Sequence, residues 1–225
     1  MKKNIQKGIA LPVTKEKELV VLVADNTMKE SINSLLLNRQ TSLGISIARD
    51  KFDIFTHPGH DPGCCKNGVD FLMPLSSRYK YALMLFDYEG SGSEDKSVEE
   101  IEEKIKVKLR QNGWADRSEV IVIYPELENW VWSSSPCLSG IIGWRNQPVG
   151  LQQWLLNEGF IKKLQQIKPK RPKEALEAVL QKIKKPRSSS IYKEIAEKVS
   201  VNGCQDRAFN KFVETLRLWF ENSGV

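Results

Sequence analysis

Acidic side chains directly follow three apolar segments of the sequence, in an arrangement that could bind a divalent metal ion. Asp25 follows LVVLVA, Asp87 and Glu89 follow YALMLF, and Glu126 and Glu128 follow VIVIYP. Carboxylates that converge at a partly buried edge repel one another, and a bound cation removes that repulsion. Ligand sets made only of oxygen favour Mg²⁺ or Mn²⁺ over zinc. We therefore expect Mg²⁺ or Mn²⁺ here, with Asp87, Glu89, Glu126 and Glu128 as metal ligands.

The same acids also have a structural interpretation, because loops begin where strands end and helix N-termini favour negative charge. This interpretation is the stronger one for each acid taken singly, whereas the metal interpretation is favoured for the three groups together. In an extended chain residues i and i+2 point the same way, so Asp87 and Glu89 are expected to face one point, as are Glu126 and Glu128. As candidate metal ligands, Asp87 and Glu89 rank first, Glu126 and Glu128 next, and Asp25 last.

Both histidines lie in one segment, His57-Pro-Gly-His60-Asp61-Pro-Gly-Cys64-Cys65. Zinc binding through His57, His60 and Cys64 is the weakest interpretation, since the spacing is loose and no second ligand group occurs elsewhere. Two interpretations have equal weight. His60 is a proton donor or phosphate contact oriented by Asp61, or the segment is a tight double turn whose polar groups bond to each other.

A glycine-rich segment, EGSGSEDKS, follows Asp87. Its Gly90-Ser91-Gly92 run would let backbone amides approach a phosphate. The run lacks the lysine of a P-loop, so a flexible loop is the favoured interpretation.

The elements that must position these residues alternate between strands and helices. Continuous apolar runs predict buried strands at 19–24, 81–86 and 120–124. Residues 43–48 and 52–55 indicate a further strand, and helices are predicted at 28–37, 69–75 and 98–111. This order predicts right-handed crossovers and an α/β fold with a mostly parallel sheet.

The chain after Trp144 differs in kind, because it contains no run typical of a buried strand. Helices are predicted at 151–158, 159–167, 173–184, 191–199 and 206–222. We therefore predict an α/β core over residues 1–145 and a basic helical subdomain over 146–225 that packs on the core. From residue 151 onward the chain carries fifteen Lys and Arg against eight Asp and Glu, whereas the preceding part carries nineteen against twenty.

Two basic clusters in this subdomain are candidate contacts to a nucleic-acid backbone. Their proposed members are Lys170, Arg171, Lys173, Lys184, Lys185 and Arg187. A solvated lysine-rich helix surface is the alternative, and charge alone does not decide between the two.

Several classes of protein are not expected. No run approaches the roughly 18 apolar residues that a membrane span needs, so no membrane partner is expected. The start, MKKNIQKGIALPV, lacks the sustained apolar segment and cleavage site of a signal peptide. The four cysteines show no disulfide-scaffold spacing, which indicates reduced thiols and a cytoplasmic protein.

The order of these acids resembles the toprim core, shared by topoisomerases, primases and the overcoming-lysogenization-defect nucleases. More specifically, HDPGC, LFDYEGSG, PELENWVWS, KPKRPKEA and AFNKFVETLRLWF resemble toprim-like proteins of bacterial phage-defence islands, including methylation-associated defence systems. The resemblance spans about residues 19–220. Two positions depart from the toprim pattern: Asp25 stands where a glutamate is typical, and Glu89 where an aspartate is typical.

This resemblance implies a toprim-like, Mg²⁺-dependent, nuclease-like enzyme that acts on phosphodiesters in bacterial antiphage defence. Asp25, His60 and Glu128 would be its catalytic residues, and its partners would be DNA or RNA and other defence proteins. The departure at Asp25 bears on catalysis more than on metal binding. The side chain of aspartate is shorter than that of glutamate, so its carboxylate lies about a methylene farther from the group on which it would act. Two alternatives are a non-catalytic binding or scaffold component of a defence complex, and an enzyme that acts on a nucleotide or small phosphoester.

Overall fold

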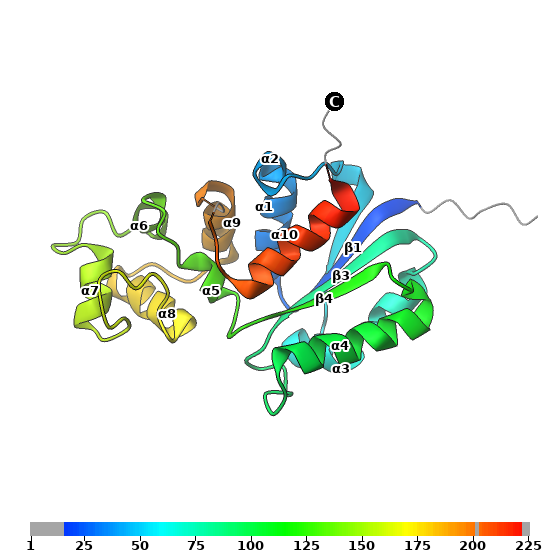
Figure 1. The fold of residues 1–225 in the computed structure, drawn as a ribbon. Helices are drawn as coiled ribbons and strands as arrows, with labels where there is room; N and C mark the ends of the chain where they lie inside the picture. Colours follow the sequence, from blue (N-terminus) through cyan, green and yellow to red (C-terminus); the bar gives the residue numbers. More distant parts are fainter. Residues whose placement is uncertain (1–15, 201–202, 222–225) are drawn as a thin grey trace, which may run out of the picture.

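Four parallel strands form the sheet in the computed structural model, which describes residues 16–200 and 203–221. The strands are β1 (Lys17–Val23), β2 (Phe52–Thr56), β3 (Tyr79–Asp87) and β4 (Ser118–Ile123), and their order across the sheet is β2-β1-β3-β4. The expected α/β class and parallel sheet are confirmed (Figure 1). The first fifteen residues, on which the signal-peptide expectation rests, lie outside the described part.

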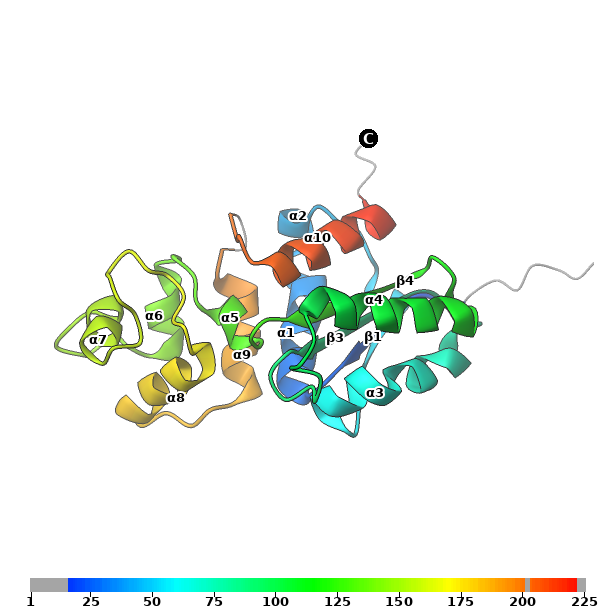
Figure 2. The ribbon, with the colours of Figure 1, turned by 60° about the horizontal axis from the view of Figure 1, so that its bottom comes forward.

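The two central strands are apolar along most of their length because helices cover both faces of the sheet. Val21 of β1 pairs with Ile54 of β2 on one side and with Leu83 of β3 on the other. The helices α3 (His60–Leu72) and α4 (Val98–Leu109) lie on one face, and α1 (Asn26–Asn38) and α10 (Arg207–Phe220) lie on the other (Figures 1 and 2). Parallel sheets buried in this way have continuous apolar strands, without polar alternation.

The free edge of β4 is covered by charged side chains. The carboxylate of Glu102, on α4, accepts a hydrogen bond from the Val122 amide at 2.8 Å. On α10, Arg207 donates to the Val122 carbonyl at 3.2 Å and Lys211 to the Val120 carbonyl at 2.8 Å, and both cations also pair with Glu102. The backbone groups of an edge strand are thereby occupied, and strand addition by another chain is blocked there.

The remaining helices lie in two places, some next to the sheet and α1, and the others to one side of the sheet. The short helix α5 (Glu128–Val131) follows β4, and α9 (Ser189–Lys198) packs along α1. Figures 1 and 2 show α6 (Cys137–Ile142), α7 (Leu151–Asn157) and α8 (Pro172–Lys182) to one side of the sheet, beyond α5 and α9. The other short elements are α2 (Gln40–Leu43), the 3₁₀ turns Arg49–Lys51 and Met73–Leu75, and the π turn Arg110–Trp114. Within the described residues, no helix has the length and apolar character needed to cross a membrane.

The structure differs from the local predictions in four places. Residues 43–48 are not a strand; apart from an isolated bridge between Ile45 and Glu221 they have no partner strand. Residues 159–167 contain no helix, and α5 and α6 arise where none was predicted. The predicted last helix ends at Phe220, and Asn222 lies outside the described residues.

The histidine segment is a helix and not a double turn, because α3 begins at His60. Pro62 is tolerated in its first turn, where backbone N–H groups have no intrahelical acceptor. The glycines serve close packing: a Cβ on Gly63 would lie 2.1 Å from His57 Nδ1, and one on Gly68 would lie 2.6 Å from Met84 Cε. Residues that usually mark turns are therefore used here to bring a helix onto the sheet.

Replacing Glu102 with alanine is expected to destabilise the protein by about 3 kcal/mol. This value is near the lower end of the cost of breaking a buried ion pair, because Arg207 keeps contact with water. The change leaves the Val122 amide without its acceptor and two cations without their carboxylate. Urea unfolding measures the loss. The matched control is Glu103→Ala on the exposed side of the same helix, and equal stabilities of the two variants would contradict the assigned role.

Candidate functional site

Each of the four strands leads into an acidic residue at the carboxyl edge of the sheet. Asp25 follows β1, Asp61 lies in the first turn of α3 after β2, Asp87 ends β3, and Glu126 follows β4. Ligands of doubly wound parallel sheets bind at this edge, beside the point where the strand order reverses. Here β1 and β3 are neighbours, and the chain runs from them in opposite directions across the sheet, from β1 to β2 and from β3 to β4.

Asp87 is the centre of this group. Its backbone amide donates to Asp61 Oδ1 at 2.8 Å, and its own Oδ1 accepts from the Leu127 amide at 2.9 Å. Burial raises the pKa of Asp87 well above its ordinary value, and the charges of nearby acids raise it further. These acids, in decreasing order of effect, are Asp61, Glu128, Glu126 and Asp25. Acids that follow the other three strands therefore lie close enough to Asp87 to act on its carboxylate.

Asp61 joins the start of α3 to the end of β3. Burial raises the pKa of this carboxyl, Asp25 raises it further, and the hydrogen bond from the Asp87 amide and the nearby His60 lower it. The exposed His60 is held at a positive φ of 51°. His60 therefore lies next to an acid of this edge, where a proton donor or a phosphate contact was expected.

His57 has a structural contact instead. Its Nδ1 accepts from the Gly59 amide at 3.0 Å, so that the neutral ring carries its proton on Nε2. Burial lowers the pKa of His57, which favours this neutral form. Cys64 is fully buried and burial raises the pKa of its thiol, so the thiolate that zinc requires is disfavoured.

Asp25 caps α1, as the structural interpretation expected. Its Oδ1 accepts from the Met28 amide at 2.8 Å. The carboxylate is half-buried, and its charge nevertheless acts on Asp61 and Asp87. Capping a helix and contributing to the acidic edge are thus combined in one side chain.

Glu126 and Glu128 are almost completely buried, at 4% and 2% exposed, and each has a cationic partner from the C-terminal helices. Glu126 accepts from the Lys173 amide at 3.1 Å and lies 3.6 Å from Lys173 Nζ. Glu128 accepts from Arg187 at 2.6 Å and from the Tyr192 hydroxyl. Burial, and next the charge of Glu128, raise the pKa of Glu126 to about 7.

Glu89 lies at the exposed rim of this group. The strand β3 ends at Asp87, so the expectation that an extended chain points Asp87 and Glu89 the same way is wrong in its premise. Glu128 likewise belongs to helix α5, and not to an extended segment with Glu126. The amide of Glu89 donates to the Pro125 carbonyl at 3.0 Å, and its charge still raises the pKa of Glu126.

The six predicted nucleic-acid contacts divide into two groups. Lys173 and Arg187 neutralise the buried glutamates, and Lys185 donates to the carbonyls of Ile141 and Ile142 at the end of α6, at 3.1 and 3.2 Å. Lys170, Lys184 and Arg171 are exposed, and Arg171 lies 3.8 Å from Glu174. Arg187 is also exposed, at 37% of its side chain, although it pairs with Glu128.

As the side chains are placed, no three His, Cys, Asp or Glu groups in the described ranges could hold a metal ion together. This covers the zinc set of His57, His60 and Cys64 as well as the acidic edge. The charges of Glu126 and Glu128 are engaged by cations, so an ion coordinated there would have to displace Lys173 or Arg187.

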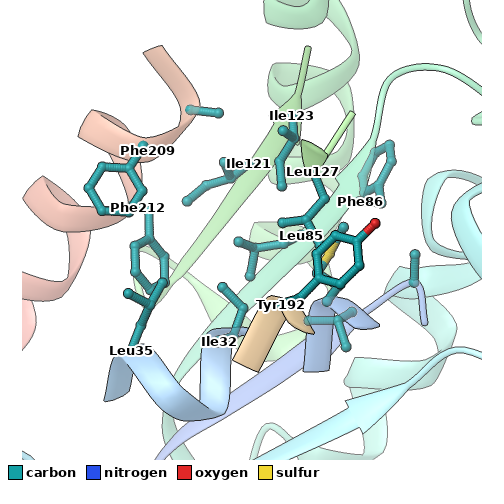
Figure 3. Close-up of a cluster of buried hydrophobic side chains, with 14 of the residues drawn as sticks. Ile32, Leu35, Leu85, Phe86, Ile121, Ile123, Leu127, Tyr192, Phe209 and Phe212 are labelled. Carbon is teal, nitrogen blue, oxygen red and sulfur yellow. The ribbon is translucent and has the colours of Figure 1, made fainter. Parts of the chain in front are cut away.

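A cavity of about 940 Å³ adjoins the acidic edge. Leu127 and Tyr192, whose polar atoms bond to Asp87 and Glu128, also line it. Figure 3 shows Leu127 and Tyr192 in the same apolar cluster as Phe209 of α10, which lies on its opposite side. The cavity thus shares a wall with the acids.

Sequence reasoning missed two residues of the site. Asp61 was considered only as a partner of His60, because its segment was not predicted to begin a helix after a strand; the rule that found the other acids would have included it. Tyr192 lies 64 residues from Glu128 along the chain, and nothing in the local sequence indicates their contact.

The raised pKa of Glu126 predicts a pH dependence of stability. The folded protein binds this proton more tightly than the unfolded chain, so the contribution is full below pH 4.5 and is lost as the pH rises to about 7. Urea unfolding should show the stability of the wild type, relative to Glu126→Gln, falling across this window.

Glu119→Gln supplies a control of opposite sign. Burial of Glu119 is outweighed by Lys106 and Lys211, which lower its pKa. Its contribution should therefore be present near neutral pH and lost as the solution becomes more acidic than pH 4.5. A flat difference between the wild type and Glu126→Gln would contradict the assigned environment of Glu126.

The acidic edge is the feature of this fold best suited to chemistry, since it gathers carboxylates, a histidine and two cations beside a cavity. No model of a known protein family, no curated protein and no solved structure matches the chain. A function for this chain must therefore be inferred from the residues of this edge.

Proposed function

We propose that this protein is a Mg²⁺- or Mn²⁺-dependent enzyme of the toprim type that acts on phosphodiester bonds in bacterial antiphage defence, in the cytoplasm. The observation that carries the proposal is the convergence on Asp87, at the end of β3, of acids that follow the other three strands. Burial, and next the repulsion from neighbouring acids, raise the pKa of Asp87, and a divalent cation is the ligand that relieves both costs. Oxygen donors alone suit Mg²⁺ and Mn²⁺.

Under this proposal Asp87 and Glu89 are metal ligands, and Glu126 or Glu128 completes the set. Asp61, bonded to the Asp87 amide, orients the end of β3. When bound, the metal stabilises the charge that develops on the phosphate and lowers the pKa of a water molecule. His60, which lies beside Asp61 and is exposed, is placed to donate a proton to a leaving oxygen, and Asp25 is the second candidate for proton transfer.

Binding of the cation also requires a change in the ion pairs. Glu126 reaches the cation only if Lys173 gives up its 3.6 Å contact, and Glu128 only if Arg187 gives up its 2.6 Å contact. The pair with Lys173 is longer and that lysine is 44% exposed, so Glu126 is the easier ligand to recruit. We therefore assign Glu126 as the third ligand ahead of Glu128.

The proposal predicts that Mg²⁺ or Mn²⁺ raises the melting temperature of the wild type and not that of Asp87→Asn. At a metal concentration 100 times its Kd, the stabilisation is about 2.7 kcal/mol. The asparagine keeps an acceptor for the Leu127 amide and removes the repulsion among the acids, so Asp87→Asn should melt no lower than the wild type without metal. Asp116→Asn, an exposed site, should behave as the wild type.

The same pair of proteins tests the activity. Cleavage or nicking of single-stranded DNA, double-stranded DNA or RNA in the presence of Mn²⁺ is expected from the wild type and should fall to background in Asp87→Asn. Absence of cleavage on all three substrates, together with no metal-dependent melting shift, would refute the enzyme.

The ion pairs themselves favour a second candidate, a non-catalytic toprim-like component of a multi-protein defence complex. Lys173, Arg187 and Tyr192 satisfy the buried glutamates without any metal ion, as expected for acids that only join the helices to the sheet. This candidate predicts no melting shift with metal and recovery of a defence protein on pull-down from a native host.

Nucleic-acid binding should depend on the exposed Lys170 and Lys184, which lie on either side of α8, and not on the paired cations. Replacing Lys184 with glutamine should weaken binding to all DNA sequences and lower the salt slope of log K by about 0.9 for each phosphate that the protein no longer neutralises. Lys185→Gln is the matched neighbour, because Lys185 already bonds to two carbonyls. Filter binding at several salt concentrations measures both, and equal slopes in the two variants would contradict this division.

A further inference from the structure

Two backbone amides in the loop between β3 and α4 point at one carboxylate. Gly90 and Gly92 have positive φ values of 87° and 71°, a conformation that directs neighbouring N–H groups into one concavity. Both amides donate to the same atom, Glu94 Oε1, at 2.8 and 3.1 Å. The concavity, which we call the amide nest, therefore holds an oxyanion that the chain itself supplies.

The shape of the amide nest is held by contacts that do not involve the Glu94 carboxylate. The Tyr88 hydroxyl donates to the carbonyls of Glu94 at 2.8 Å and Lys96 at 3.0 Å. Ser91 is fully buried, and its Oγ accepts from the Ser93 amide at 3.2 Å. Ser93 Oγ in turn lies 3.3 Å from the Cys65 thiol on α3. Removal of the carboxylate should therefore leave the two amides where they are.

The surroundings of the amide nest suit an exchangeable anion. Glu94 is exposed, and the amides of Glu94 itself, Gly92 and Gly90 lower the pKa of its carboxyl. Lys66 Nζ would lie 3.3 Å from a Cβ on Gly92, which brings a positive charge to the rim, and nothing lies within 4 Å of the corresponding position on Gly90. The nest begins one residue after Glu89, at the acidic edge.

We propose that the amide nest is a phosphate-binding subsite, and that the Glu94 carboxylate is an internal stand-in which a phosphate oxygen of the substrate replaces. This inference deepens the proposed function and rests on it, because it places the phosphate beside the carboxylates that hold the cation. Lys66 contributes charge to the bound phosphate, and the amides of Gly90 and Gly92 orient it. Glu94 competes with the substrate, so its removal strengthens anion binding.

The test is a metal-free titration of the full chain with inorganic phosphate, followed by the amide resonances of Gly90 and Gly92 at constant ionic strength maintained with chloride. In Glu94→Ala both amide protons should move downfield, with half-saturation at a phosphate concentration at least about tenfold below that of the wild type. Asp95→Ala removes the same charge one residue away, from a side chain that bonds to Lys96 and not to the nest. It should titrate as the wild type does.

Three results would overturn the inference: no response of the two amides in Glu94→Ala, an equal response in Asp95→Ala, or collapse of the loop in Glu94→Ala. Glu94→Gln is the second variant: it keeps an acceptor without a charge, and it should also bind phosphate more tightly than the wild type. The titration needs no metal. A failed titration beside a metal-dependent melting shift would therefore overturn the amide nest alone, and the reverse pattern would support the nest and overturn the enzyme.

Discussion

Repulsion among carboxylates at the carboxyl edge of the sheet is the constraint on which the rest of the structure depends. An all-parallel sheet carries every strand toward the same edge, so an acid that follows each strand meets the others. Backbone amides offset part of the repulsion: Met28 donates to Asp25, Asp87 to Asp61, and Leu127 to the Asp87 side chain. These bonds also fix where each loop leaves the sheet.

Cations from distant parts of the chain offset the remainder, and in doing so they join the C-terminal helices to the core. Lys173 at the start of α8 pairs with Glu126, and Arg187 just before α9 pairs with Glu128. A ligand that neutralises these glutamates competes with the contacts that hold α8 and α9. The acidic edge is thus both the candidate site and the joint between the sheet and the helices beside it. Chemistry at the edge and the position of α8 are coupled for the same electrostatic reason.

A second network closes the sheet at its far side. Glu102 bonds to the β4 backbone, and α10 brings Arg207 and Lys211 to the same strand and the same carboxylate. The chain therefore returns to its core after building α6, α7 and α8 outside it. Both networks use charged groups in the same way, since each places cations from the C-terminal part of the chain against acids of the α/β part.

The sequence by itself determined the sheet and most of its acids. In an α/β fold, long runs rich in valine, isoleucine and leucine form strands buried on both faces. An acid after each run then lies at the carboxyl edge of the sheet. Local signals failed where the reason for a residue is a contact across the fold. Gly63 lies in the segment interpreted as a double turn, whereas Gly63 and Gly68 are small so that α3 can approach His57 and Met84.

Only the tertiary structure decided which acids lie close enough to repel one another and which cations offset that repulsion. The partners of Glu128 are 59 and 64 residues away, and pairing at that range depends on how helices pack and not on any local pattern. The structure also divided the basic residues into those bonded inside the protein and those facing solvent, a distinction that composition cannot make. Spacing along the chain predicted that the acids would meet; their protonation and their partners depend on burial, which is a property of the assembled fold.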